Sequence, residues 1–185
     1  MLFRSMSTFP PSTLALSAFD NAWDTAPKPR TTSVEGLVRA LTRFPVIPTA
    51  NKLALPAWSP ARFEAGRPRC AEAVLDVSCL VLDHDEGDPD AALAAWSGLF
   101  AVAHSTWSHT LAAPRFRVVV PLARPVPAAR WARAWAWAIE RAPGADSVCK
   151  DASRLYFRPA VPAPDAPRFA RVQPGELLEI GRAHV

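Results

Sequence analysis

The sequence predicts an α+β domain built on an antiparallel sheet of the split βαβ kind. Three observations predict it. The chain has 185 residues, half of them hydrophobic, which suits one domain with a small appendage. From residue 75 onward, apolar runs of strand length alternate with segments of helical periodicity. Their order is strand, helix, strand, strand, helix, strand, the order of ferredoxin-like and RNA-recognition-motif (RRM) folds.

Residues 1–30 are rich in Ser, Thr, Pro and Asp and show little periodicity, which predicts a loosely structured N-terminal arm. Phe19 and Trp23 are its expected anchors.

An additional N-terminal α/β unit is expected over residues 31–74. Its helix should run from about Ser33 to Phe44, because a capping-box pattern precedes apolar residues at helical spacing. A short strand is expected at Asn51–Leu55, presenting Lys52, and Ser59-Pro60 has the chemistry of a helix start, predicting a brief helix through Phe63.

The core is expected over residues 75–162, and residues 163–185 are expected to form a C-terminal extension packing on it. β-Branched and aromatic runs predict the strands, and proline with an N-cap residue or a periodic apolar face predicts the helices. The expected strands are Ser78–Leu82, Ala101–Ser105, Arg115–Pro121 and Arg154–Arg158, and the expected helices begin at Asp88 and Pro127.

In an RRM-like sheet the first and third strands are central and the fourth lies beside the first. Four distant segments then meet at one edge: the loop after the first strand, the turn containing His109, the start of the third strand, and the approach to the fourth.

Composition excludes several classes of protein. No apolar run approaches the roughly 18 residues of a membrane span, and the three cysteines form no CxxC pair, so a protein of the reducing cytoplasm without membrane contact is expected. Motifs of P-loop ATPases, dinucleotide-binding folds, zincins and α/β-hydrolases are missing. Twenty-one Lys and Arg against 17 Asp and Glu weakly favour a polyanionic partner.

Paired carboxylates follow the first strand. Asp83 and Asp85 alternate with His84, so both can point from one face toward one cation. Hard oxygen ligands select Mg²⁺ or Mn²⁺, and a third carboxylate from Asp146 would complete a site for two ions. An acidic loop after a strand is also often a solvated turn.

Basic groups converge on the same edge. An imidazole at His109 can bind a phosphate oxygen, whereas a strand histidine such as His104 more often has a hydrogen-bonded place in the core. The cationic side chains that can hold a triphosphate or a nucleic-acid backbone are Arg115, Arg117, Lys150 and Arg154.

Four segments together resemble the catalytic core of archaeo-eukaryotic primases, in the primase-polymerase branch found on phages and plasmids. They are LDHDEG (Leu82–Gly87), HSTWSHT (His104–Thr110), PRFRVVVPLARPV (Pro114–Val126) and DSVCKDASRLYFRP (Asp146–Pro159). The resemblance covers about Lys52 to Pro162 and implies an RRM-like core with an added α/β unit.

The resemblance also implies site residues and chemistry. Asp83 and Asp85 match the DxD ligands, His109 with Ser108 matches the nucleotide-binding histidine motif, and Asp146 matches the third acid, with Asp151 as its rival. The implied activity is that of a DNA primase/polymerase, a nucleotidyltransferase using two Mg²⁺ or Mn²⁺ ions, with single-stranded DNA template and nucleoside triphosphates as partners. Lys52 is a possible further contact, and relatives often work with a replicative helicase. In this chain Trp107 stands where the motif usually has a small residue.

Two other functions would use the same residues. A non-catalytic single-stranded nucleic-acid-binding module of replication initiation would use the sheet alone. A metal-dependent nuclease or phosphohydrolase would need the carboxylates but no triphosphate pocket.

Overall fold

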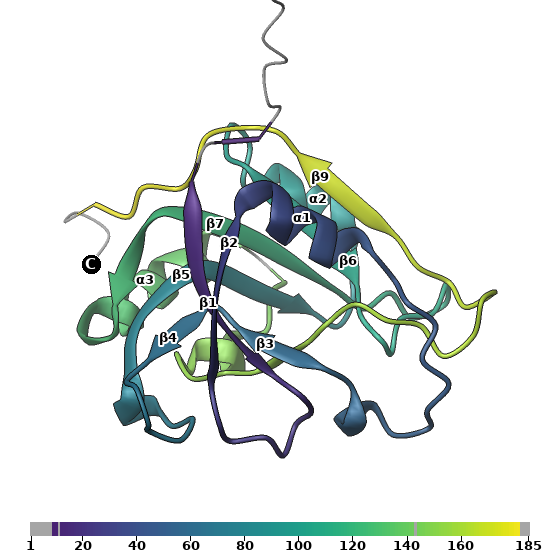
Figure 1. Ribbon diagram of the computed structural model, residues 1–185. Helices are drawn as coiled ribbons and strands as arrows, with labels where there is room; N and C mark the ends of the chain where they lie inside the picture. Colours follow the sequence, from purple (N-terminus) through teal and green to yellow (C-terminus); the bar gives the residue numbers. More distant parts are fainter. Residues whose placement is uncertain (1–8, 11, 143, 182–185) are drawn as a thin grey trace, which may run out of the picture.

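Two antiparallel sheets and three α-helices make up the described part of the chain, residues 9–10, 12–142 and 144–181 of a computed structural model (Figure 1). The predicted α+β class with antiparallel sheets is therefore confirmed. The four-stranded sheet has the order β2-β1-β3-β8 and the five-stranded sheet β4-β5-β7-β6-β9. The element bounds are β1 Thr13–Phe19, β2 Lys28–Ser33, α1 Val34–Thr42, β3 Ala57–Ser59, β4 Ala61–Phe63, β5 Val74–His84, α2 Pro89–Ala94, β6 Ala101–Ser105, β7 Phe116–Pro127, α3 Ala128–Arg141, β8 Tyr156–Phe157 and β9 Ala170–Gln173.

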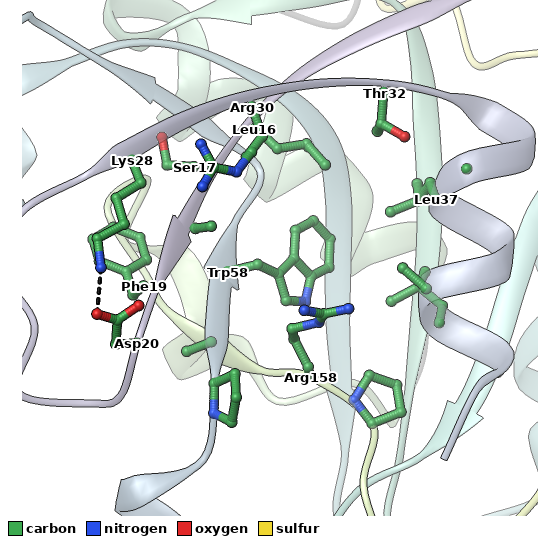
Figure 2. A pocket seen from close by; sticks show the side chains of 17 residues that line it. Leu16, Ser17, Phe19, Asp20, Lys28, Arg30, Thr32, Leu37, Trp58 and Arg158 are labelled. Atoms are coloured by element: carbon green, nitrogen blue, oxygen red, sulfur yellow. Dashed lines mark ion pairs between the residues drawn. The ribbon is translucent and has the colours of Figure 1, made fainter. Parts of the chain in front are cut away.

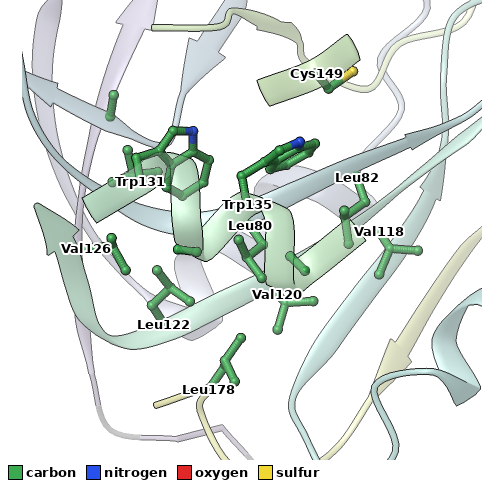
Figure 3. Packing of buried hydrophobic residues seen from close by; sticks show 14 of the residues in the cluster. Leu80, Leu82, Val118, Val120, Leu122, Val126, Trp131, Trp135, Cys149 and Leu178 are labelled. Atoms are coloured by element: carbon green, nitrogen blue, oxygen red, sulfur yellow. The ribbon is translucent and has the colours of Figure 1, made fainter. Parts of the chain in front are cut away.

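The five-stranded sheet is buried on both faces, because successive side chains of a strand point to opposite sides. Leu80 and Leu82 of β5 pack in one cluster with residues of α2 and α3, while Cys79 and Val81 pack in a second cluster with α1 and the four-stranded sheet. Figure 3 shows the first of these packings. Such two-sided burial explains why the central strands read as continuous apolar runs rather than alternating ones.

Helix α3 presents a buried stripe at Trp131, Ala134, Trp135 and Ala138, positions separated by three or four residues and therefore on one face. Trp131 also donates its indole N–H to the carbonyl of Lys150 at 2.8 Å. That bond ties the helix to the segment that carries Asp146.

The two other helices begin where the sequence predicts. Ser33 caps α1 by accepting the Gly36 N–H at 3.1 Å, and Asp88 caps α2 by accepting the Asp90 N–H at 3.0 Å. Both side chains satisfy amide groups that a helix start leaves without partners.

The prediction of a loosely structured arm over residues 1–30 is wrong from residue 13 onward, where the chain forms strands. Thr13–Phe19 forms β1, which pairs with β2 on one side and β3 on the other. Phe19 is buried as an anchor, but Trp23 is 60% exposed. Partners distant in sequence impose the strand, which local composition does not reveal. Residues 1–8 lie outside the described residues.

The predictions of two short elements in the N-terminal unit are also wrong. Lys52–Ala54 is a 3₁₀ turn rather than a strand, closed by the Asn51 side chain accepting the Leu53 N–H at 3.0 Å. The expected helix from Ser59 through Phe63 is instead β3 followed by β4. Pro60 lies between them, and the chain passes there from one sheet to the other.

The RRM-like arrangement holds for only three strands. β5, β7 and β6 take the expected order of first, third and second, but β8, the predicted fourth strand, pairs with β3 in the other sheet. The free edge at the end of β5 is met by a turn, since the Asp146 N–H donates to the Asp83 carbonyl at 2.8 Å. The segment that was expected to complete the sheet thus passes from that edge to the neighbouring sheet.

After β8 the chain returns to the five-stranded sheet, where β9 pairs with β6 and Leu178 bridges to Leu122. Residues 182–185 lie outside the described residues, and the division of the chain at residues 30, 74 and 162 stays a prediction. Among the described helices none is long and apolar enough to cross a membrane.

Candidate functional site

A pocket of about 230 Å³ opens where β5 ends, between the two sheets. The edge where distant segments were expected to meet is therefore a real cavity. The pocket brings together eight of the predicted site residues: Lys52, Asp83, Asp85, Ser108, Arg115, Arg117, Asp146 and Arg154. Its wall also contains His84, Thr106, Trp107, Leu155 and Phe157.

Asp83 is an enclosed acid of the pocket. It lies opposite Arg117 in the β5–β7 register, and the Arg117 Nε donates to its Oδ1. A second guanidinium, that of Arg154, lies 3.7 Å from its Oδ2. The side chains of Asp83 and Arg117 are only 16% and 12% exposed, so their charges compensate each other in a place that water screens poorly.

The ring of Tyr156 supports both arginines. The guanidinium carbons of Arg117 and Arg154 lie 5.2 and 6.0 Å from the ring centroid, within cation–π range. Arg117 also donates to the Phe157 carbonyl at 3.0 Å. Strand β8 therefore fixes the cations of the pocket although it belongs to the other sheet.

Asp85 lies at the mouth of the pocket. Its carboxylate accepts from Arg115 Nη1 at 2.9 Å, and its side chain is 69% exposed. Between them His84, which also lines the pocket, has its ring buried and stacked on Phe116 with ring centroids 4.7 Å apart. Asp83 and Asp85 both line the pocket, as strand spacing predicts.

Asp146 approaches Asp83 through a shared neighbour. The Cys149 thiol lies 3.5 Å from Asp83 Oδ2 and 3.4 Å from Asp146 Oδ2, within hydrogen-bonding distance of both carboxylates. Burial, with Asp83 as the next cause, raises the pKa of Cys149 to about 12, so the thiol keeps its proton for donation near neutral pH.

The rival acid and one predicted cation do not reach the pocket wall. Asp151 accepts from the Ser153 N–H at 2.8 Å and from its hydroxyl at 2.9 Å. Lys150 is exposed, and neither residue lines the pocket. Of the two candidates for the third acid, Asp146 is the one beside Asp83.

His109 lies beside the pocket rather than in its wall. Its Nδ1 accepts the Arg115 N–H at 3.3 Å, and its ring meets Phe169 edge-on at 5.2 Å. Burial lowers the pKa of His109, which favours the neutral imidazole with its proton on Nε2. His104, expected in the core, is fully buried and bonds the Ser105 carbonyl at 3.0 Å.

The chemistry of the donor set fits a hard divalent cation. Three carboxylates, Asp83, Asp85 and Asp146, line one pocket, and carboxylate oxygens are what Mg²⁺ and Mn²⁺ prefer. In the described residues, however, no three Asp, Glu, His or Cys side chains gather as a ready metal cluster. Instead, Asp83 and Asp85 are paired with arginines. A bound ion would therefore replace the arginines as the partner of these carboxylates.

Sequence reasoning missed Cys149 and the wall formed by Leu155 and Phe157. The sequence predictions use the cysteines only through the lack of a CxxC pair, although the spacing of three residues between Asp146 and Cys149 puts both side chains on one helical turn. The wall residues gave no signal, because β8 was expected at a different sheet edge.

The fold of the chain is similar to that of an archaeo-eukaryotic primase (AEP) domain. The structure is similar to the AEP domain of the primase-polymerase of cyanophage S-2L, with a TM-score of 0.50 and 17% sequence identity, over 91% of this chain and 85% of that one. At this identity the likeness establishes the fold.

The family of the chain follows from its sequence. The family model of the VapE N-terminal domain matches residues 60–182, well over half of the chain, and the protein belongs to that family. No curated protein matches it. The resemblance inferred from the four motifs is thereby confirmed.

Proposed function

We propose that the protein is a DNA primase/polymerase that joins nucleotides on a single-stranded template, with the pocket at the end of β5 as its active site. The observation that carries the proposal is the convergence of three carboxylates and three arginines, from segments remote in sequence, in one cavity of an AEP-type fold. Scattered surface charges would have no reason to gather in this way.

Each charged group has a role in this proposal. Asp83, Asp85 and Asp146 would hold two Mg²⁺ or Mn²⁺ ions, which when bound supply charge neutralisation for the triphosphate and activate the attacking hydroxyl. Arg115, Arg117 and Arg154 would orient the phosphates, since a guanidinium fork matches phosphate oxygens. Lys52 at the pocket wall would add a further cation for the strand or the triphosphate.

The arginine pairs support a stepwise exchange of partners. Arg115 and Arg117 neutralise Asp85 and Asp83 in the described structure. On binding of a nucleoside triphosphate with its cations, the acids would turn to the cations and the arginines to the phosphates. No charge would then be left uncompensated in the half-buried pocket.

A second candidate is a non-catalytic module that binds single-stranded nucleic acid. The same arginine pairs and the lack of a ready metal cluster in the described residues favour it, because acids already neutralised need no ion. A replicative helicase as a working partner remains part of the proposal for either candidate.

One assay separates the candidates. The protein is incubated with a single-stranded DNA template, labelled nucleotides and Mg²⁺ or Mn²⁺. New labelled strands are expected and should vanish with EDTA and in the Asp85→Ala variant. A template that is only shifted on a gel would overturn the proposal in favour of the binding module, and a degraded template would overturn it in favour of a nuclease.

A further inference from the structure

A second cavity, of about 370 Å³, lies between α1 and the four-stranded sheet (Figure 2). Its size is within the range of ligand pockets. Leu16, Leu37 and Trp58 contribute an apolar lining. One step along the chain links it to the candidate active site, since Phe157 lines that pocket and Arg158 lines this cavity.

The rim of the cavity is basic. Lys28, Arg30 and Arg158 line it, and an adjoining hollow of about 170 Å³, which shares Ala40 and Arg158 with it, adds Arg43. We call the two hollows together the basic groove. Its one acid, Asp20, is paired with Lys28.

The arginines of the basic groove differ from those of the active-site pocket in their partners. Arg115, Arg117 and Arg154 are engaged with carboxylates. Among the described residues, Arg30, Arg43 and Arg158 have no carboxylate within ion-pair distance. They are therefore available to an anion from outside.

Trp58 adds an independent observation, a buried hydrogen-bond donor in the cavity wall. Its side chain lines the cavity, the residue is only 6% exposed, and its indole N–H is buried without an acceptor among the described residues. Figure 2 shows the nitrogen side of the indole turned toward the Arg158 guanidinium. A buried donor without a partner is costly, and a phosphate oxygen between these two groups would satisfy both.

We propose that the basic groove binds single-stranded DNA, with a base in the apolar cavity and adjacent phosphates on Arg30, Arg43 and Arg158. An apolar floor with a cationic rim matches an unstacked strand, whose bases are free and whose charge is carried by phosphates. A duplex keeps its bases stacked and cannot fill the cavity. That the strand is the template rests on the proposed function, but binding itself requires neither nucleotide nor metal.

The test compares two charge-matched double variants. R43A/R158A removes two cations of the groove, and R130A/R133A removes two exposed arginines of α3, on the opposite face of the five-stranded sheet. Binding of a fluorescent oligo(dT) is measured by anisotropy in EDTA at several salt concentrations. We expect R43A/R158A to weaken binding at least fivefold and to reduce the slope of log K against log salt by about 1.4, at about 0.7 per lost contact on a single strand. The α3 pair should change affinity less than twofold.

Ala40→Trp tests the cavity without changing charge. Ala40 lines both hollows from α1, so a large side chain there should obstruct the base and weaken binding to a similar degree, at a melting temperature close to that of the parent. Equal losses in the two double variants, or unchanged binding in both R43A/R158A and the Ala40→Trp protein, would overturn the inference.

The readout is independent of the proposed catalysis. Binding that depends on the groove, in a protein that never incorporates nucleotides, would support this inference while overturning the proposed function. Nucleotide incorporation together with DNA binding that neither R43A/R158A nor Ala40→Trp changes would support the proposed function while overturning this inference.

Discussion

Asp83 and Arg117 face each other across the β5–β7 ladder, and their carboxylate and guanidinium are directly hydrogen-bonded. The other carboxylate oxygen of Asp83, Oδ2, is approached by both Arg154 and the Cys149 thiol, and this thiol also reaches Asp146. One carboxylate thereby connects both central strands, the turn at the free edge of β5 and the approach to β8. Its removal should affect the fold as well as the chemistry.

Asp83→Ala and Asp85→Ala should differ in stability while both abolish nucleotide incorporation. Loss of Asp83 leaves Arg117 uncompensated in a poorly solvated place, which should lower the free energy of unfolding by about 3 kcal/mol. Asp85 is largely exposed, so its loss should cost less than about 1 kcal/mol. Urea denaturation of the two variants checks the difference, and equal midpoints would contradict the enclosed position of Asp83.

Cys149→Ala and Cys149→Ser should separate packing from hydrogen bonding. Alanine removes the donor between Asp83 and Asp146, and partners that orient ligands typically change metal affinity by tenfold or more. We expect Mn²⁺ binding, followed by calorimetry, to weaken roughly tenfold in the alanine variant and to be largely restored by serine. Similar losses in both variants would assign Cys149 a packing role only.

His109→Ala should raise the nucleotide concentration needed for half-maximal incorporation by about tenfold. The neutral imidazole directs its Nε2–H away from the Arg115 amide, leaving a donor for a phosphate oxygen. The maximal rate should fall much less. Incorporation kinetics at varied nucleotide concentration measure both, and an unchanged concentration dependence would remove His109 from the site.

Stability should fall as the pH drops from about 6.5 toward 4. Burial, with Arg117 as a further cause, lowers the pKa of His104 to about 4, and burial also lowers that of His84. The unfolded chain takes up these protons below pH 6.5, whereas the folded chain does not, so acid favours unfolding. His104 alone should contribute on the order of 2–3 kcal/mol across this interval.

Urea midpoints measured between pH 7 and 4.5 follow this loss. The His104→Gln variant is the control, because its side chain does not titrate, and its midpoint should depend less steeply on pH than that of the parent. Parallel curves for the two proteins would show that His104 is not held neutral.

Several features follow from the sequence alone because their causes are local. The caps at Ser33 and Asp88 lie within four residues of the amides they satisfy, and the apolar runs of β5, β6 and β7 mark strands buried on both faces. Alternation along β5 sends Asp83 and Asp85 to one side. The family resemblance was likewise readable from four short motifs.

Only the tertiary structure decided how the segments outside β5, β6 and β7 pair and pack. β1 and β8 exist as strands through pairing with β2 and β3, partners 10 to 100 residues away in the chain, and no local pattern specifies such long-range pairing. The same pairing takes β8 away from β5, leaves the edge of β5 to the Asp146 turn, and builds a pocket wall from Phe157. Local spacing thus determined which charged side chains lie near the end of β5. The way in which the two sheets meet determined which of these side chains line the same cavity.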